Sequence, residues 1–547
     1  MPLKLSNRPF QRNKNLFGRG AALFLFGCGL AALCSGREVE INILHTADLH
    51  GHLEPVRVDD REAGLSADTA HQARPAGGLL RCAAIINQIR AEATNAVLID
   101  CGDLFQGSVA GYLTRGDVMV KAVRYLRYDA LVVGNHEFDW GVERLRALYR
   151  RAEIPVLAAG ITAPAGQSLP HARPFLVRQL DGVKLVIIGL TNPYIPNWSR
   201  PRLLGGLQFP DTLEALRPVV EQARKIKPDI LVLAVHQGWR QWGDHRGNQV
   251  NSIAKAFPDF DLIIGAHTHQ AVEGQEINRI IYTQAGCYGL WLGRVVLRFD
   301  DERRRLTRIE PRLIPVSGEA PPDPELEKLA AADLSSAGLY LRRKVGENKH
   351  EITAREKTPG QSGAQTLIAA AISEAVGAEI VFHGGLSAAS LPAGAVRMAD
   401  VWKIVPYENT ISKAWLTPAE ISEILEENSG YYGKDQFRGI YGLVYELNPR
   451  ALAGARVRNL CRSDGREIKH GERISFAVNS YDLASAGGRF PRLREIMERS
   501  GSRLEETDQD TRAAVVEYIK KHAPLEIEAA PGAAVKRGGI GANVPRR

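Results

Sequence analysis

Short apolar runs alternate with helical patterns in the first half of the chain, and a polar cluster follows each run. The five clearest runs are rich in Val, Ile and Leu and begin at Glu40, Asn95, Asp129, Asp229 and Asp261. Runs without polar alternation are typical of strands buried on both faces, and GLLRCAAIINQIRAEA at residues 78–93 has the spacing of a helix. With two further strand patterns from Lys184 and Arg279, this predicts an α/β domain ending near Pro315.

A second domain is expected after a connector. The chain has 547 residues, more than one hydrophobic core usually supports. A Pro-rich loop from Pro315 leads into a helical pattern, and new helix and strand patterns follow. The expected parts are a leader at 1–36, a first domain at 37–315, a linker helix at 316–345, a second domain at 346–528 and a disordered, Gly-rich tail at 529–547.

The leader has the pattern of an export signal. Basic residues precede thirteen mainly apolar residues, Ala21–Leu33, which are too few to span a bilayer comfortably and are followed by small residues. We therefore expect an exported protein, periplasmic or at the cell surface. Cys28 and Cys34 each end an imperfect lipid-attachment pattern, so membrane association is expected only if one of them is lipid-anchored.

The charge distribution argues against a nucleic-acid partner. The net charge is +8, but five basic residues precede residue 37 and four lie at the carboxyl end, so the body of the chain is close to neutral.

Outside the leader only four scattered cysteines remain, which excludes a disulfide framework and allows one bridge. The sequence carries no signal for oligomeric state.

The polar clusters after the apolar runs supply the ligand types that divalent transition metals accept. They contain Asp48, His50, Asp103, Asn135, His136, His236, His267 and His269. Each signal is weak alone, because a histidine after a strand is more often structural, as we expect for His45. Ligands from five strand ends are too many for one ion and suit two ions that together activate water and neutralise a phosphate. The absence of HExxH disfavours a zinc peptidase.

These clusters resemble a known family. DLHGH, GDLFQGS, GNHEFDWG, the histidine of AVHQGW, and GAHTH resemble, in order, the five blocks of the calcineurin-like metallophosphoesterases. ILHTADLHGHLEP narrows the resemblance to the secreted 5′-nucleotidase family, which includes UDP-sugar hydrolases and 2′,3′-cyclic-nucleotide phosphodiesterases. The resemblance implies a four-layer α/β/β/α sandwich followed by an α+β nucleotide-binding domain.

The same resemblance implies the roles of the site residues. One metal ion would be held by Asp48, His50, Asp103 and His269, and the other by Asp103, Asn135, His236 and His267. The ions are expected to be Zn, Mn, Co or Fe. His136 would face the phosphate and be oriented by Asp139, as catalytic residues, while Glu137 is assigned to structure.

The second domain supplies the expected substrate-binding residues. VPYENTIS and FAVNSYDLASAGGRFP resemble family segments in which an aromatic residue, here Tyr481, stacks on a base. Phe437 is either the second wall of a base sandwich or a core residue. The expected set is Tyr481, Phe437, Arg438, Asn409, Gly487 and Gly488.

The chain also departs from the family pattern. In FHGGLSAAS, His383 replaces the usual Asn, and Ser387 or a neighbour replaces the Arg that helps to hold phosphate. Arg489 replaces an acidic residue, and GGRF resembles the cyclic-nucleotide branch. A nucleoside 5′-monophosphate is the expected substrate. The alternatives are a 2′,3′-cyclic-nucleotide phosphodiesterase with 3′-nucleotidase activity, a UDP-sugar hydrolase and a non-catalytic nucleotide-binding protein.

Overall fold

The computed structural model describes residues 37–56 and 76–535. The predicted leader, with Cys28 and Cys34, lies outside the described residues, as does the carboxyl end from residue 536. Among the described helices, none has both the length and the apolar character needed to cross a membrane.

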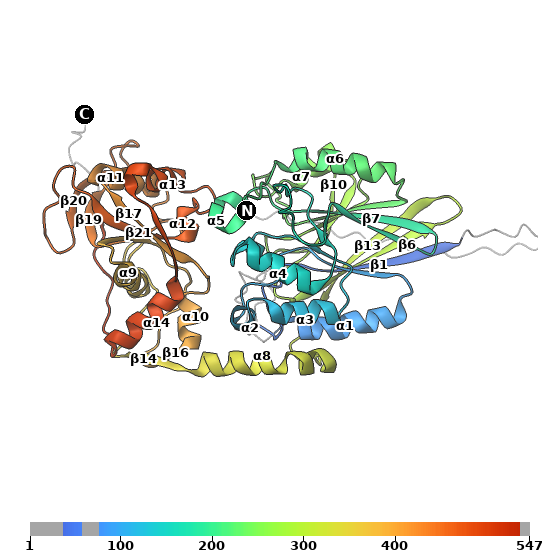
Figure 1. The fold of residues 1–547 in the computed structure, drawn as a ribbon, viewed down its shortest axis with the longest axis horizontal. Coiled ribbons are helices and arrows are strands. Elements are labelled where there is room, and N and C mark those ends of the chain that lie inside the picture. Colours follow the sequence, from blue (N-terminus) through green and yellow to red (C-terminus); the bar gives the residue numbers. More distant parts are fainter. Residues whose placement is uncertain (1–36, 57–75, 536–547) are drawn as a thin grey trace, which may run out of the picture.

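Two stacked sheets form the centre of the amino-terminal domain (Figure 1). The first has the order β13-β12-β1-β2-β3-β4-β5, and the second has the order β10-β11-β9-β8-β7-β6. The strands of the first sheet are β1 (Glu38–Thr46), β2 (Ala96–Asp100), β3 (Ala130–Val132), β4 (Val156–Leu157), β5 (Ala172–Arg173), β12 (Trp291–Asp300) and β13 (Arg305–Pro315). Those of the second are β6 (Phe175–Leu180), β7 (Val183–Leu190), β8 (Ile230–Val235), β9 (Leu262–Gly265), β10 (Ala271–Ile277) and β11 (Ile280–Ala285).

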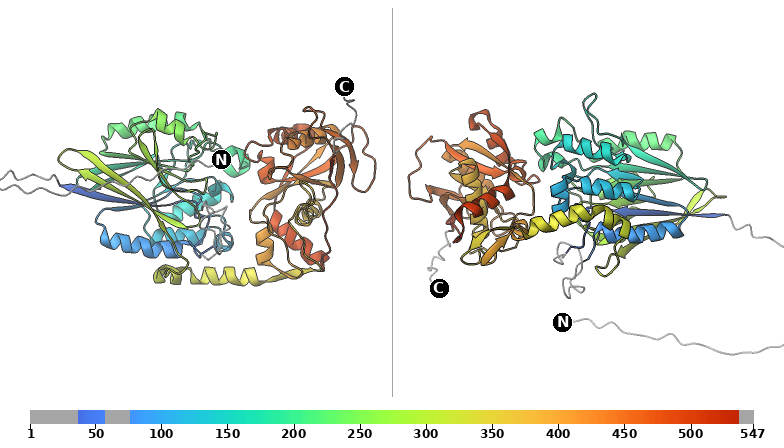
Figure 2. Two further views of the ribbon diagram at one scale, coloured as in Figure 1. Left: turned by 180° about the vertical axis from the view of Figure 1, so that it is seen from behind. Right: turned by 60° about the horizontal axis from the view of Figure 1, so that its bottom comes forward.

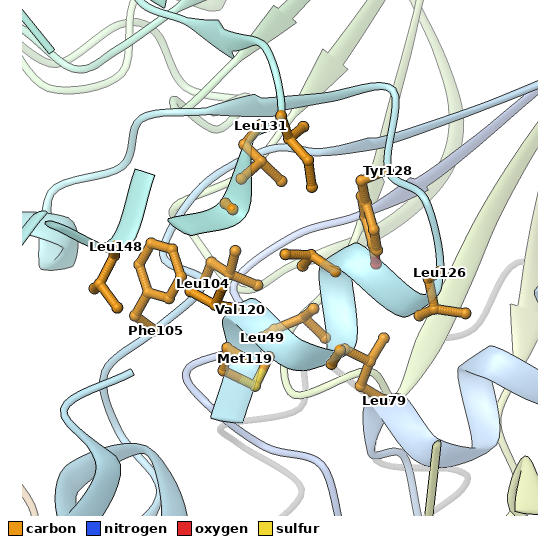
Figure 3. Packing of buried hydrophobic residues seen from close by; sticks show 14 of the residues in the cluster. Leu49, Leu79, Leu104, Phe105, Met119, Val120, Leu126, Tyr128, Leu131 and Leu148 are labelled. Carbon is orange, nitrogen blue, oxygen red and sulfur yellow. The ribbon is translucent and has the colours of Figure 1, made fainter. Parts of the chain in front are cut away.

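Helices cover the outer face of each sheet and complete four layers. The first sheet carries α1 (Leu79–Glu92), α2 (Val109–Thr114), α3 (Asp117–Tyr125) and α4 (Val142–Ala152), and the second carries α6 (Thr212–Lys225) and α7 (Val250–Ala256). One core lies between the sheets and one lies under each helical layer. Figure 3 shows the layer in which Leu49, Met119 and Leu131 pack together. The predicted sandwich is confirmed.

The parallel strands place the polar clusters at one end of the domain. β1 pairs in parallel with β2, and β2 with β3; in the other sheet, β7, β8 and β9 are also parallel neighbours. Asp48, Asp103 and Asn135 follow strands of the first sheet, whereas His236 and His267 follow strands of the second. Because the carboxyl ends of parallel strands meet at one edge, all five positions converge there.

Helix α8 (Pro324–Arg342) joins the domains while packing on the first one. Asp323 caps it through the Leu326 N–H, and also accepts hydrogen bonds from Asn87 and Tyr125. Leu326, Ala330 and Ala337 belong to the first domain's core. Figures 1 and 2 show the helix running along one side of the molecule from the first domain to the second.

The second domain contains a five-stranded sheet with helices on both faces. Its strand order is β18-β15-β21-β17-β22. Val381 and Ala477 pack under one helical layer, whereas their neighbours Phe382 and Phe476 face the other, as the alternation of side chains along a strand requires. The strands are β15 (Ile380–His383), β17 (Thr410–Leu416), β18 (Gly439–Tyr441), β21 (Ile474–Asn479) and β22 (Glu505–Asp510). The two layers are α9 (Gly363–Val376), α10 (Met398–Ile404) and α14 (Thr511–His522) on one face, and α11 (Pro418–Ser429) and α13 (Pro491–Glu498) on the other.

Two smaller sheets complete this domain. β14 (Lys344–Asn348) pairs with β16 (Gly394–Arg397), and β19 (Leu443–Leu447) lies between β20 (Val457–Arg462) and β23 (Ala533–Val535). Within the predicted disordered tail at 529–547, Ala533–Val535 forms a strand that pairs in parallel with β19. This strand is stabilised by its pairing with β19. Its three small residues are too few to show the hydrophobic pattern from which a strand is predicted.

Candidate metal centre and interdomain cleft

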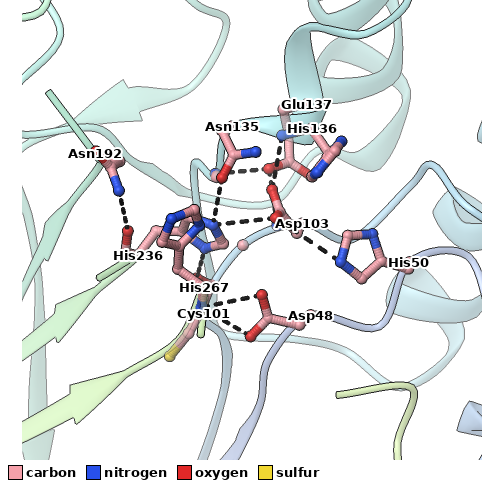
Figure 4. A network of polar contacts seen from close by, with 12 residues as sticks. Asp48, His50, Cys101, Asp103, Asn135, His136, Glu137, Asn192, His236 and His267 are labelled. Carbon is pink, nitrogen blue, oxygen red and sulfur yellow. Dashed lines mark hydrogen bonds and ion pairs between the residues drawn. The ribbon is translucent and has the colours of Figure 1, made fainter. Parts of the chain in front are cut away.

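The structure brings the seven predicted metal ligands together at the strand ends. The ligands form two groups, and within each group the ligand atoms lie within 4.8 Å of one another. One group is Asp48, His50 and His269, and the other is Asp103, His236 and His267. Asn135 joins the second group, since its Oδ1 lies 3.1 Å from Nε2 of His236. Figure 4 shows residues of both groups around Asp103. Two carboxylates, an amide oxygen and four imidazoles in this space fit divalent transition metals.

Hydrogen bonds orient two of the imidazoles for metal binding. His50 directs Nδ1 to the carbonyl of Gln106 at 3.1 Å, and His236 directs Nδ1 to the carbonyl of Cys101 at 2.8 Å. A carbonyl oxygen only accepts hydrogen bonds, so these contacts place a hydrogen on Nδ1 and turn Nε2 toward the centre. Burial lowers the pKa of His267 to about 3 and that of His269 to about 4, which favours the neutral form that binds metal.

Asp103 lies between the two groups. Its Oδ2 is 3.2 Å from Nε2 of His236 and 3.9 Å from Nε2 of His50, which belongs to the other group. Its Oδ1 accepts the backbone N–H of His136 at 2.8 Å. The side chain is buried and therefore held in place. This position fits a carboxylate shared by two ions.

The backbone around the centre is strained. Five of the seven residues have positive φ: Asp48 at 50°, His50 at 46°, Asp103 at 57°, His267 at 73° and His269 at 55°. Non-glycine residues adopt this conformation infrequently, and such strain is concentrated at functional sites. The surrounding fold therefore maintains the ligand positions at an energetic cost.

His136 faces the centre without being one of its ligands. Its Nδ1 is 2.8 Å from Oδ2 of Asp139, one turn further along the 3-10 helix at His136–Phe138. Burial alone would lower the pKa of His136, but the charges of Asp139 and Asp103 and the Asp139 hydrogen bond raise it to about 10. The imidazole is therefore protonated and can stabilise negative charge or donate a proton.

Glu137 and His45 have the structural roles expected for them. The Glu137 carboxylate accepts the backbone N–H groups of Asp103, Leu104 and Gly134 at 2.6–2.9 Å. His45 is fully buried on β1 opposite Gly293, where any side chain would collide with the imidazole.

A cleft of about 450 Å³ joins the metal centre to the second domain. From the first domain it is lined by Asn135, His136, Asp139, Trp198, Ser199 and His267. From the second domain it is lined by Gly385, Leu386, Tyr407, Glu408, Asn409, Arg438, Tyr481 and Arg489. The cleft thus has candidate metal ligands at one end and an aromatic and cationic wall in the second domain.

Comparison with known proteins identifies both halves of the chain. Residues 41–271 match the family model for the calcineurin-like phosphoesterases, and residues 344–495 match that for the 5′-nucleotidase C-terminal domain. Protein UshA of Yersinia enterocolitica is 26% identical over 546 residues, covering 90% of this chain and 92% of that protein. The chain belongs to the 5′-nucleotidase family of metallophosphoesterases.

Two further similarities support this membership. A 5′-nucleotidase of Vibrio cholerae is 25% identical over 539 residues, covering 88% of this chain and 92% of that protein. The structure of a 5′-nucleotidase precursor from Thermus thermophilus shares the fold with a TM-score of 0.69 at 22% identity, covering 91% and 99% of the two chains. As a family member, the chain is a metal-dependent phosphoric ester hydrolase whose fold implies divalent metal ions.

The substrate-binding residues expected for this 5′-nucleotidase family member are only partly in the cleft. Tyr481, Asn409 and Arg438 line it. Phe437 is not among the lining residues; it is 4% exposed, packs 5.4 Å from the Tyr432 ring and lines an adjoining cavity of about 510 Å³. Gly385 and Leu386 line both cavities, and the sandwich of a base between Tyr481 and Phe437 stays a prediction.

Gly487 and Gly488 also lie outside the cleft and contact the first domain. The Gly487 N–H donates to the carbonyl of Asn197 at 3.0 Å. A Cβ on Gly488 would lie 2.0 Å from the Tyr194 hydroxyl. Their predicted role in substrate binding is replaced here by close packing between the domains, for which only glycine leaves room.

The cleft also contains residues that sequence reasoning missed. Trp198 lies 5.0 Å from the His267 ring, between the metal centre and the second domain. Glu408 accepts a hydrogen bond from the indole N–H of Trp140 in the first domain. Tyr407 and Glu408 directly precede Asn409 in PYEN, and this polar cluster was the signal that could have identified them. Trp198 does not directly follow a strand, so the sequence offered no comparable signal for it.

Ion pairs hold the two domains together beside the cleft. The Arg200 side chain, 4% exposed, pairs with Glu498 at 2.6 Å and Glu506 at 3.0 Å. Arg202 pairs with Asp508 at 2.7 Å. Both arginines flank or lie in the short helix α5 (Pro201–Leu204), which Figure 1 shows next to the second domain.

Proposed function

We propose that this enzyme hydrolyses nucleoside 5′-monophosphates and releases inorganic phosphate. One observation carries the proposal: a single cleft is lined by candidate metal ligands Asn135 and His267 at one end and by the Tyr481 ring at the other. A nucleotide presents the matching groups, a phosphate and a flat base. The cleft volume of about 450 Å³ is in the range of small-molecule sites.

The residues of the chain have separate tasks in this proposal. His136, held by Asp139, would donate its proton to the ester oxygen that leaves with the nucleoside. Tyr481 would stack on the base, which contributes roughly 1–3 kcal/mol. Trp198 and Leu386 would close the cleft against water between these two ends.

We further propose two divalent ions, one at each ligand group, with Asp103 shared. Zn, Mn, Co and Fe all accept this set of nitrogen and oxygen ligands. When bound, the ions would neutralise phosphate charge and activate the attacking water. The location that we propose is the periplasm or the cell surface, because the leader has the pattern of an export signal.

Phosphate release by the purified protein tests the proposal. The protein is loaded with Mn²⁺ or Zn²⁺ and given 5′-AMP, 3′-AMP, UDP-glucose, 2′,3′-cyclic AMP and bis-p-nitrophenyl phosphate in parallel. Products of the diesters are followed by chromatography, because their first cleavage frees no phosphate. The highest kcat/KM for 5′-AMP supports the proposal, whereas preference for the cyclic substrate or UDP-glucose would replace it with the corresponding alternative.

A further inference from the structure

Arg489 places an unneutralised positive charge on the cleft wall. Its Nη2 donates to the Tyr481 hydroxyl at 2.9 Å, and the guanidinium carbon lies 5.6 Å from the Tyr481 ring centroid. Its Nε is buried and has no hydrogen-bond partner. Among the described residues, no carboxylate lies within ion-pair distance of this guanidinium.

The other arginine of the cleft provides a direct contrast. Arg438 donates from Nε and Nη2 to the same oxygen of Asp482, at 3.1 and 3.0 Å. Asp482 is fully buried and lies behind the cleft wall. The charge of Arg438 is therefore neutralised by the protein, and its guanidinium is fixed, whereas Arg489 has no such partner.

The remaining charges of the cleft are also engaged with other groups. Asp139 holds His136, and Glu408 accepts the Trp140 indole N–H and lies near the charge of Arg512. Ser387, from the segment where an arginine was expected, donates to the carbonyl of Lys403 and does not line the cleft. Arg489 is thus the cleft cation left to meet a ligand.

We infer that Arg489 selects substrates that carry a second anionic group besides the terminal phosphoryl group that is removed. The inference rests on the proposed function and specifies its substrate class: nucleotides with a terminal phosphoryl group and one further phosphate. An arginine beside an aromatic ring offers paired N–H donors to a phosphate, and such charge-assisted bonds are strong in a partly dehydrated cleft.

The second phosphate has two chemical sources, a sugar hydroxyl or the phosphoryl chain. Adenosine 3′,5′-bisphosphate tests the first and ADP tests the second, each compared with 5′-AMP in kcat/KM for phosphate release. We expect one of them to exceed 5′-AMP by about 10-fold or more in the wild-type enzyme. The better substrate identifies the source.

Substitutions of Arg489 test whether this side chain causes the preference. The ratio of interest is kcat/KM for the better two-phosphate substrate divided by kcat/KM for 5′-AMP. Arg489→Gln should reduce this ratio to below about 3, and Arg489→Lys should retain part of the preference because the charge remains. Arg492→Gln is the matched control: this neighbouring arginine lies outside the cleft and is paired with Glu423 and Glu495, so the ratio should stay at the wild-type value. Circular dichroism verifies that each variant is folded.

The outcomes separate this inference from the proposed function. Hydrolysis of 5′-AMP without any gain from a second phosphate overturns the inference alone. An equal gain in wild type and Arg489→Gln also overturns it, because another group would then bind the anion. Hydrolysis of bis-p-nitrophenyl phosphate without hydrolysis of any nucleotide overturns both.

Discussion

His136 and Asp139 form a hydrogen bond of 2.8 Å between Nδ1 and Oδ2. The two residues are three positions apart, and the backbone N–H of His136 is held at the same time by Asp103. The imidazole is therefore fixed from two sides, by its ring and by its backbone. This arrangement directs its other nitrogen toward the cleft and keeps the ring protonated.

Loss of this pair should slow hydrolysis without removing metal. We expect His136→Ala to lower kcat by about 10²–10⁴-fold, and Asp139→Asn by a smaller factor, because general acid catalysis is lost or misaligned. Metal content, measured by mass spectrometry of the purified proteins, should equal that of the wild type. Wild-type kcat in His136→Ala would contradict the assigned role.

Asp103 should be required for both metal binding and activity. Asp103→Ala removes the carboxylate that reaches both ligand groups, so we expect metal content to fall by at least half and hydrolysis to become undetectable. A chelator should inactivate the wild type, and added Mn²⁺ or Zn²⁺ should restore it. The control is His171→Gln, which changes an exposed histidine that belongs to neither ligand group and should retain metal and activity.

Tyr481 and Phe437 should respond differently to the same substitution. Tyr481→Ala should raise KM for 5′-AMP by roughly 5- to 100-fold, since a stacking partner is lost. Phe437→Ala should leave KM near the wild-type value and lower the free energy of unfolding by about 3 kcal/mol, because the ring is buried against Tyr432. An equal rise in KM for both variants would show that both rings contact the substrate.

Glu408 should make stability depend on pH. Burial raises its pKa from an ordinary value of 4.5 to about 7, although Arg512 and the Trp140 hydrogen bond oppose the shift. Between these values the folded protein holds a proton that the unfolded chain has released, so stability falls as pH rises. The wild type should therefore lose unfolding free energy between pH 4.5 and pH 7.5. In Glu408→Gln this loss should be smaller by up to ~3 kcal/mol.

Denaturant titrations at the two pH values measure this difference. Glu517→Gln, which changes an exposed glutamate, should leave the wild-type difference intact. An unchanged difference in Glu408→Gln would mean that other groups cause the pH dependence.

Gly488 should be needed for the contact between domains. Gly488→Ala places a Cβ 2.0 Å from the Tyr194 hydroxyl at a φ of +78°, so we expect the domains to shift and kcat/KM to fall by about 10- to 100-fold. Gly454→Ala has a similar φ of +85° but open space around it, and should only lower stability. Tyr194→Phe should partly rescue Gly488→Ala; a lack of rescue would show that backbone strain dominates.

The elements with strong local patterns and the types of candidate ligands could be predicted from the amino-acid sequence. Apolar runs predicted the buried strands, and the polar clusters after them predicted that Asp48, Asp103, Asn135 and the histidines would converge, because parallel strands end at a common edge. The family resemblance supplied the pairing of His136 with Asp139. These features depend on residues close in sequence or on a general rule of sheet geometry.

Which second-domain residues face the cleft depends on the tertiary fold and could not be predicted from local patterns. Tyr481 and Phe437 are both aromatic residues in segments that resemble the family pattern, yet Tyr481 lines the cleft and Phe437 lines an adjoining cavity. Asp482 neutralises Arg438, 44 positions away, and Gly488 contacts Tyr194, almost 300 positions away. Arg489 contacts Tyr481 and has no carboxylate partner among the described residues. Such relationships arise from packing between distant segments, which has no periodic signature in the sequence.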